Sequence, residues 1–136
     1  MDEIVTTSDL HDLMKDGADV QTTVFDFGES VIKRTTKGDL CILTISGVYT
    51  RALGKEIEKL GLQWRSNLGI EFKDIRANPT GRKKFDSSIV GVLKNIRERY
   101  RNREKQLLLC TPPSELLDLL KLTGVHAGYQ IIEDPA

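Results

Sequence analysis

The stretch Leu40-Cys41-Ile42-Leu43-Thr44-Ile45-Ser46 decides the fold. The run is nearly continuously apolar and rich in β-branched residues, which is typical of a strand covered on both faces. Gly47 breaks the run, and Thr50 can then cap a helix. The apolar residues of that helix recur at helical spacing: Leu53, Ile57, Leu60 and Trp64. A buried strand followed at once by an amphipathic helix predicts a β-α unit and a largely parallel sheet.

The segments on either side extend this pattern. Before it, Val31–Thr36 reads as a strand that Lys37-Gly38-Asp39 joins to the buried one by a tight hairpin turn. After it, Leu68–Lys73 alternates apolar and polar residues, which predicts a half-buried strand weaker than its neighbours. We expect further strands at Gln106–Cys110 and Gln130–Glu133, and further helices that start near Asp86 and Ser114.

The predicted order is therefore β-β-α-β-α-β-α-β. We expect an α/β fold with a mostly parallel sheet of four to five strands, begun by a hairpin and packed against helices. Its core should include Leu43, Ile45, Leu107 and Leu109. Residues 76–85 hold a turn sequence and a basic run with one apolar side chain at the end, so we expect an exposed loop there.

Residues 1–28 read as a partly ordered N-terminal extension, and residues 29–134 as the main domain. Within the extension, Ser8 can cap a short helix with Leu10, Leu13 and Met14 on one face. Thr22–Phe27 can form an extra short strand.

Composition excludes several classes of protein. The 136 residues carry 20 Lys and Arg and 20 Asp and Glu, so a net charge of zero gives no general attraction to nucleic acid or anionic membrane. The longest apolar stretches, such as Leu107–Cys110, are far shorter than a membrane span. The acidic N-terminus lacks a signal core, so we expect a cytoplasmic protein whose Cys41 and Cys110 are reduced and buried. The two histidines, His11 and His126, lie far apart and there is no glycine-rich phosphate loop, so we expect no metal site and no cofactor.

Three local motifs, in order, resemble the STAS domain of bacterial anti-sigma factor antagonists. Residues 43–50, Leu-Thr-Ile-Ser-Gly-Val-Tyr-Thr, look like the family's strand ending in Gly-Glu-Leu-Asp. Residues 85–93, Phe-Asp-Ser-Ser-Ile-Val-Gly-Val-Leu, are similar to its Asp-Ser-Ser-Gly-Leu-Gly-Val-Leu. Residues 119–125, Leu-Leu-Lys-Leu-Thr-Gly-Val, look like the close of its last helix. The chain departs from the pattern at Thr50, which replaces an acidic residue, and at Ile89, which replaces a glycine.

The resemblance implies a regulatory module whose first serine in Asp-Ser-Ser is phosphorylated by a partner that is both anti-sigma factor and kinase, with a phosphatase reversing the step. That serine is Ser87, with Asp86, Ser88 and Ile89 as its neighbours and partner contacts. A serine at a helix N-terminus suits this role, because nearby backbone N–H groups can receive phosphate oxygens.

Other interpretations of the same residues stay open at this point. Asp86, Ser87 and Ser88 could only cap the helix, and Ile89 would place a branched side chain where a partner approaches. The basic run Arg82, Lys83 and Lys84 could steer an acidic partner, pair with a phosphate, or be solvated. The cations near the end of the same helix suit its dipole better than they suit nucleic acid, because base-stacking aromatics are missing there: Arg97, Arg99, Arg101, Arg103 and Lys105.

No catalytic constellation is evident, so we expect no enzyme activity. Two alternatives to the phosphorylated antagonist remain: a STAS scaffold or subunit of a larger assembly without a phosphoswitch, and a nucleotide-binding module.

Overall fold

A computed structural model of the chain describes residues 6–14, 19–78, 83–101 and 104–133. The elements in chain order are α1 (Thr7–Leu13), β1 (Val20–Asp26), β2 (Ser30–Lys37), β3 (Leu40–Val48), α2 (Arg51–Gln63), β4 (Asn67–Arg76), α3 (Ser88–Tyr100), β5 (Leu107–Cys110), α4 (Ser114–Thr123), the 3-10 helix η1 (Val125–Gly128) and β6 (Gln130–Ile132). The α/β class, the opening hairpin and the three predicted helix starts are confirmed.

One sheet runs through the molecule in the order β1-β2-β3-β4-β5-β6. The pairs β1–β2 and β2–β3 are antiparallel, and the pairs from β3 to β6 are parallel. The sheet therefore has six strands rather than four or five, because Val20–Asp26 pairs with β2 along its whole length. Gly28 in the connecting turn has a φ of 87°, a left-handed conformation that glycine adopts without steric cost.

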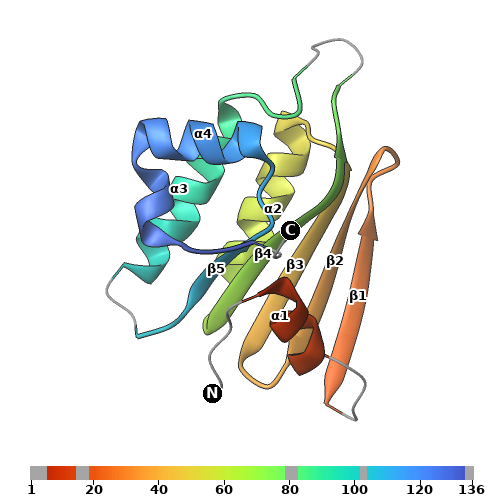
Figure 1. The fold of residues 1–136 in the computed structure, drawn as a ribbon. Coiled ribbons are helices and arrows are strands. Elements are labelled where there is room, and N and C mark those ends of the chain that lie inside the picture. The colour runs from red at the N-terminus through yellow and green to blue at the C-terminus, as the bar shows by residue number, and fades with distance from the viewer. Residues whose placement is uncertain (1–5, 15–18, 79–82, 102–103, 134–136) are drawn as a thin grey trace.

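The helices α2, α3 and α4 cover one face of the sheet (Figure 1). The main hydrophobic core lies between them and the strands, and it contains the four side chains predicted for it, Leu43, Ile45, Leu107 and Leu109, none more than 5% exposed. Ile57 from α2, with Leu93 and Ile96 from α3, completes its centre. The apolar residues that recur at helical spacing in the sequence thus form the sides of these helices that pack into the core.

The short helix α1 lies on the other face of the sheet (Figure 1). Thr6, rather than Ser8, caps it, in a capping box with Asp9. Leu10 is fully buried in a second, smaller cluster with apolar residues of β3, β5 and β6: Leu40, Ile42, Leu108, Cys110 and Ile132. The seven residues of α1 therefore close part of a face that α2, α3 and α4 leave open.

The sequence predicts that β4 is a weak, half-buried strand, and this prediction is wrong. It is the central strand between β3 and β5, and its first six residues, 67–72, are all buried. Polar residues survive there because they are hydrogen-bonded: the Asn67 amide donates to the Asp39 carboxylate at 3.2 Å and accepts from the Gln106 backbone N–H at 2.8 Å. Gly69 admits the side chain of Ile42, since a Cβ there would lie 2.7 Å from the Ile42 Cδ1.

The expected exposed loop at 76–85 is wrong at both ends, because β4 includes Arg76 and Phe85 is buried. Phe85 is only 2% exposed and packs against Tyr49 and Phe72, with ring centroids 5.4 and 5.6 Å apart. This aromatic cluster anchors the chain immediately before α3. Residues 79–82 lie outside the described residues.

Candidate functional site

Ser87 lies at the N-cap position of α3, as predicted, and its side chain is exposed. Its backbone is already helical, with φ −63° and ψ −16°, and its hydroxyl makes no capping hydrogen bond. An N-cap serine normally has an extended backbone and accepts from the first turn. The Ser87 hydroxyl is therefore not committed to holding the helix end.

Asp86 performs the capping instead. Its carboxylate accepts a hydrogen bond from the Ser88 backbone N–H at 2.8 Å and another from the Ser88 hydroxyl. The next two N–H groups, of Ile89 and Val90, donate to the carbonyls of Asp86 and Ser87 at 3.3 and 3.1 Å. The N–H groups expected to receive a phosphate are thus engaged within the chain, so a phosphate on Ser87 would project outward.

Tyr49, a residue that the sequence analysis did not single out, joins β3 to this helix end. The Tyr49 and Ser88 hydroxyl oxygens lie 2.8 Å apart. Because the one Ser88 hydroxyl proton goes to Asp86, Tyr49 is the donor in this contact. The side chain is only 3% exposed, and burial raises the pKa of Tyr49, which keeps the donor protonated. Gly54 of α2 makes room for the phenol, since a Cβ there would collide with the Tyr49 oxygen.

A groove of about 660 Å³ lies beside Ser87, between the start of α3 and one face of α4. The α4 residues that line it follow helical spacing: Glu115, Asp118, Leu119 and Leu122. Leu122 is 84% exposed, so its side chain meets solvent at the groove. Lys83, Phe85, Asp86 and Ser87 complete the lining. The groove therefore offers apolar surface with carboxylates on its rim.

The other predicted site residues divide between surface and core. Lys83 and Lys84 are exposed, and the Lys84 backbone N–H donates to the Glu115 carboxylate at 3.4 Å. Arg82 lies outside the described residues. Ile89 is fully buried in the core, so its interpretation as a partner contact is wrong. Its branched side chain points inward and leaves the approach to Ser87 open.

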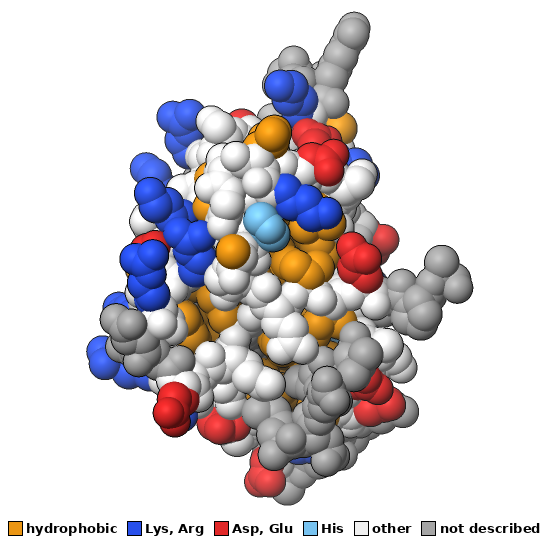
Figure 2. Space-filling view, turned by 60° about the vertical axis from the view of Figure 1, so that its left-hand side comes forward, with side chains coloured by type: hydrophobic (Ala, Val, Ile, Leu, Met, Phe, Trp, Pro, Cys, Tyr) orange, Lys and Arg blue, Asp and Glu red, His pale blue; other side chains and the backbone are white. Residues whose placement is uncertain are grey.

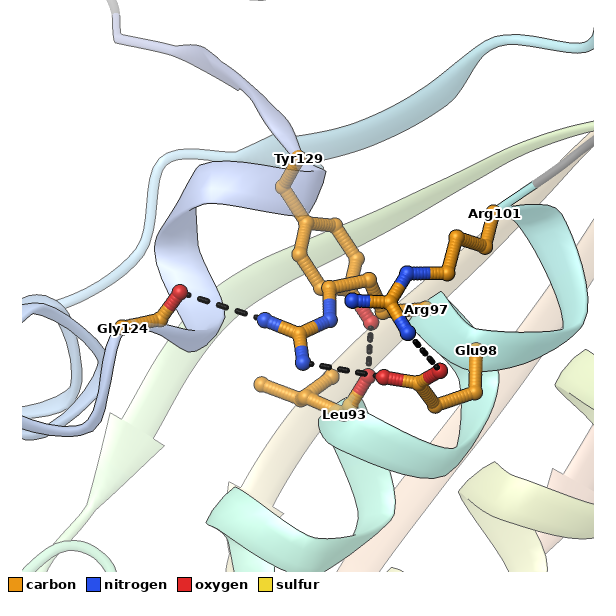
Figure 3. A network of polar contacts seen from close by, with 6 residues as sticks. All are labelled: Leu93, Arg97, Glu98, Arg101, Gly124 and Tyr129. Atoms are coloured by element: carbon orange, nitrogen blue, oxygen red, sulfur yellow. Dashed lines mark hydrogen bonds and ion pairs between the residues drawn. The ribbon is translucent and has the colours of Figure 1, made fainter.

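The opposite end of α3 carries the arginines (Figure 3). Arg97 donates to the Gly124 carbonyl at 3.1 Å and to the Glu98 carboxylate at 3.0 Å, and Arg101 donates to the same carboxylate at 3.2 Å. These hydrogen bonds, Arg97 first, lower the pKa of Glu98. Positive side chains gather along one side of the helix-covered surface (Figure 2). Arg97 thus ties α3 to the α4–η1 corner, and Arg101 pairs with Glu98 at the end of α3 itself, which supports their structural interpretation.

The described residues also bear on a metal site and on a membrane span. No group of three or more His, Cys, Asp or Glu side chains is placed to hold a metal ion there. No helix in the described part of the chain has the length and apolar character needed to cross a bilayer.

The comparison with known protein families agrees with the fold. No curated protein sequence matches the chain significantly. The family model for the STAS domain matches residues 29–134, from the hairpin before β2 to the end of β6. Because this match covers more than half of the chain, the protein belongs to the STAS domain family, a family of regulatory modules that work through protein–protein contacts.

Proposed function

We propose that the chain is an anti-sigma factor antagonist whose binding to an anti-sigma factor with serine kinase activity is switched by phosphorylation of Ser87. The observation that carries the proposal is the exposed Ser87 hydroxyl at the start of α3, left uncommitted because Asp86 caps the helix. By the family resemblance, a phosphatase restores the unmodified form. The module acts by binding and has no catalysis of its own.

The groove beside Ser87 supports this proposal because it joins the modification site to a contact surface. An apolar partner side chain can pack on Leu119 and Leu122, while Glu115 and Asp118 favour a basic neighbour on the partner. A phosphate adds about −1.5 to −2 charges at neutral pH. With the first-turn N–H groups engaged, that charge stays at the surface and acts on the partner.

The first test measures affinity for the cognate kinase partner with the wild type, Ser87→Ala and Ser87→Asp. Ser87→Ala should bind as the wild type does, because the hydroxyl makes no capping hydrogen bond. Ser87→Asp should weaken binding by tenfold or more, since an uncompensated charge in a close interface costs on the order of several kcal/mol. Its effect on unfolding should stay within about 1 kcal/mol, the scale of cap substitutions.

Ser114→Asp is the matched control, because it places the same charge on an exposed serine at the start of α4. It should leave affinity near that of the wild type. Equal affinities for the wild type, Ser87→Ala and Ser87→Asp would reject the switch.

The second test is mass spectrometry after incubation with the kinase partner and ATP. One phosphate should appear on Ser87 and none on Ser87→Ala. Ser88 should stay unmodified, because Asp86 and Tyr49 engage its hydroxyl. Tight binding without phosphate uptake would instead make the chain an unswitched scaffold.

A further inference from the structure

The two edges of the sheet differ in how they are protected. Strand β6 forms one edge and is only three residues long. Strand β1 forms the other edge and is seven residues long (Figure 1). Edge strands in soluble proteins are normally blunted by shortness, lysine, proline or a bulge, because their unpaired backbone groups can pair with another chain. The two edges should therefore behave differently toward other copies of the chain.

Strand β1 has none of these protections. Its sequence, Val-Gln-Thr-Thr-Val-Phe-Asp, contains no lysine, arginine or proline, and its pairing with β2 runs without a register shift. Two of the three large hydrophobic side chains that are exposed among the described residues lie in this strand or directly after it, Val24 at 60% and Phe27 at 43%. The edge is thus long and regular, with exposed apolar side chains in it and beside it.

The alternation of hydrogen-bonded and non-bonded pairs along the hairpin shows which backbone groups of β1 point away from β2. The Phe27 N–H donates to the Ser30 carbonyl at 2.9 Å, and the register continues from this pair to Phe25↔Ile32 and Thr23↔Arg34. Because bonded and non-bonded pairs alternate in an antiparallel ladder, the other residues direct N–H and C=O away from β2. These are Val20, Thr22, Val24 and Asp26, and no described residue pairs with them on that side.

We propose that β1 is a self-complementary edge through which two copies of this chain join their sheets, antiparallel, around a two-fold axis at Thr23. In this register Thr22 of one copy pairs with Val24 of the other, and Val20 pairs with Asp26. All four outward residues of each strand are then bonded. Thr23 faces its own copy across the axis, and no like charges lie opposite each other.

A second copy can satisfy this edge, because in this register all four outward residues pair and Val20 rather than a second carboxylate lies opposite Asp26. Closed two-fold pairs are also the commonest assembly of soluble chains. The interface is small, so the dimer should be reversible and depend on protein concentration. It leaves the groove beside Ser87 untouched, because β1 and α4 lie on opposite sides of the molecule (Figure 1).

Sedimentation velocity of the full chain at increasing concentration tests the proposal. The wild type should shift from monomer to dimer, and Thr22→Pro should stay monomeric with an unchanged Tm, because it removes only an outward N–H. Thr23→Pro, one residue away, is the matched control: it removes an N–H bonded to β2 and should lower the Tm. A wild type that stays monomeric, or a dimer that survives Thr22→Pro, would overturn the proposal.

A charge swap tests the axis and does not depend on the proline variants folding. Thr23→Lys and Thr23→Glu should each weaken dimerisation several-fold, because like charges then meet across the axis. An equimolar mixture of the two should form heterodimers at least as well as the wild type pairs with itself. If the mixture dimerises no more tightly than either variant alone, this register is ruled out.

Discussion

The two faces of the sheet are closed in different ways. On one face, α2, α3 and α4 bury a continuous core against the strands. On the other, α1 alone contributes Leu10 to a small apolar cluster. Polar contacts lie beside this cluster: His11 contacts the buried carboxylate of Glu71 at 2.8 Å, and Thr44 donates to it at 3.1 Å. A pocket of about 310 Å³ opens beside this carboxylate.

From this difference we expect α1 to separate from the sheet at a lower free energy than α2, α3 and α4 do. The helix-covered face lies within the residues matched by the STAS family, whereas α1 precedes them. A seven-residue helix is not stable alone, so α1 depends on its docking contacts. We therefore expect α1 to detach while the main core stays folded, as weakly held segments commonly do.

Each face carries one cysteine, and this gives the comparison a built-in reporter. Cys41 belongs to the main core and Cys110 to the cluster under α1, and both are fully buried and not in a disulfide. Burial raises the pKa of the Cys41 thiol to about 12, so the folded protein holds it as an unreactive thiol.

The largest expected effect comes from truncating the main core. Leu93→Ala removes a fully buried side chain of α3 and should lower the free energy of unfolding by about 2–5 kcal/mol. Leu10→Ala should cost less, about 1.5–3 kcal/mol at most, because the loss cannot exceed the docking energy of α1. Urea denaturation measures both, with Leu122→Ala as an exposed control. Equal losses for Leu93→Ala and Leu10→Ala would contradict the comparison.

The second effect is on thiol reactivity. Leu10→Ala should accelerate labelling of Cys110 by a disulfide reagent roughly ten- to hundredfold. This factor corresponds to the expected loss of about 1.5–3 kcal/mol in the free energy that holds α1 on the sheet. Cys41 should react only through global unfolding, so it should stay the slower thiol in the wild type and in Leu10→Ala, and its rate should change only with the free energy of unfolding. Cys41→Ser and Cys110→Ser variants assign the two rates. Equal labelling rates for the two thiols would show that α1 opens together with the core.

A smaller effect should follow from Glu71→Gln. The amide keeps the size of the side chain but loses the charge that His11 and Thr44 contact, which costs about 1 kcal/mol. Cys110 labelling should then rise about fivefold and stay faster than Cys41 labelling. Glu56→Gln on α2 is the control and should alter neither rate. No change in Glu71→Gln would mean that the carboxylate does not hold α1.

The smallest effect concerns the outer surface of the helix layer. The pKa of Glu98 is lowered in the folded state, so its contribution to stability is present above the unfolded value near 4.5 and is lost as pH falls through the folded value. Glu98→Gln should therefore lower the Tm slightly at pH 7 and match the wild type in acid. Thermal melts across this range check it, and a constant difference at all pH values would contradict it.

The elements with regular periodicity could be predicted from the sequence. Thr50 caps α2 as its position indicates, with its hydroxyl accepting from the Leu53 N–H at 3.1 Å. The Lys37-Gly38-Asp39 turn and the position of Ser87 are also confirmed. In each case a local signal and the global fold agree.

Two of the errors arise because the partners of a residue lie far away in the sequence. Glu71 made β4 look half exposed, but Thr44 and His11 supply its partners from distant parts of the chain. Phe85 looked like part of a loop because its aromatic neighbours, Tyr49 and Phe72, are far away in sequence. The capping by Asp86 could not be distinguished from capping by Ser87, since both residue types favour that position.

Helix α1 contacts residues far along the sequence, and this affects how the chain folds during synthesis. Of the described elements α1 leaves the ribosome first, yet Glu71 follows His11 by 60 residues, and Leu108 and Ile132 are made later still. The β1–β3 meander can pair from local contacts while α1 has no surface to rest on. Its docking therefore requires synthesis to have passed β6, because residues of β5 and β6 form part of the face that holds it.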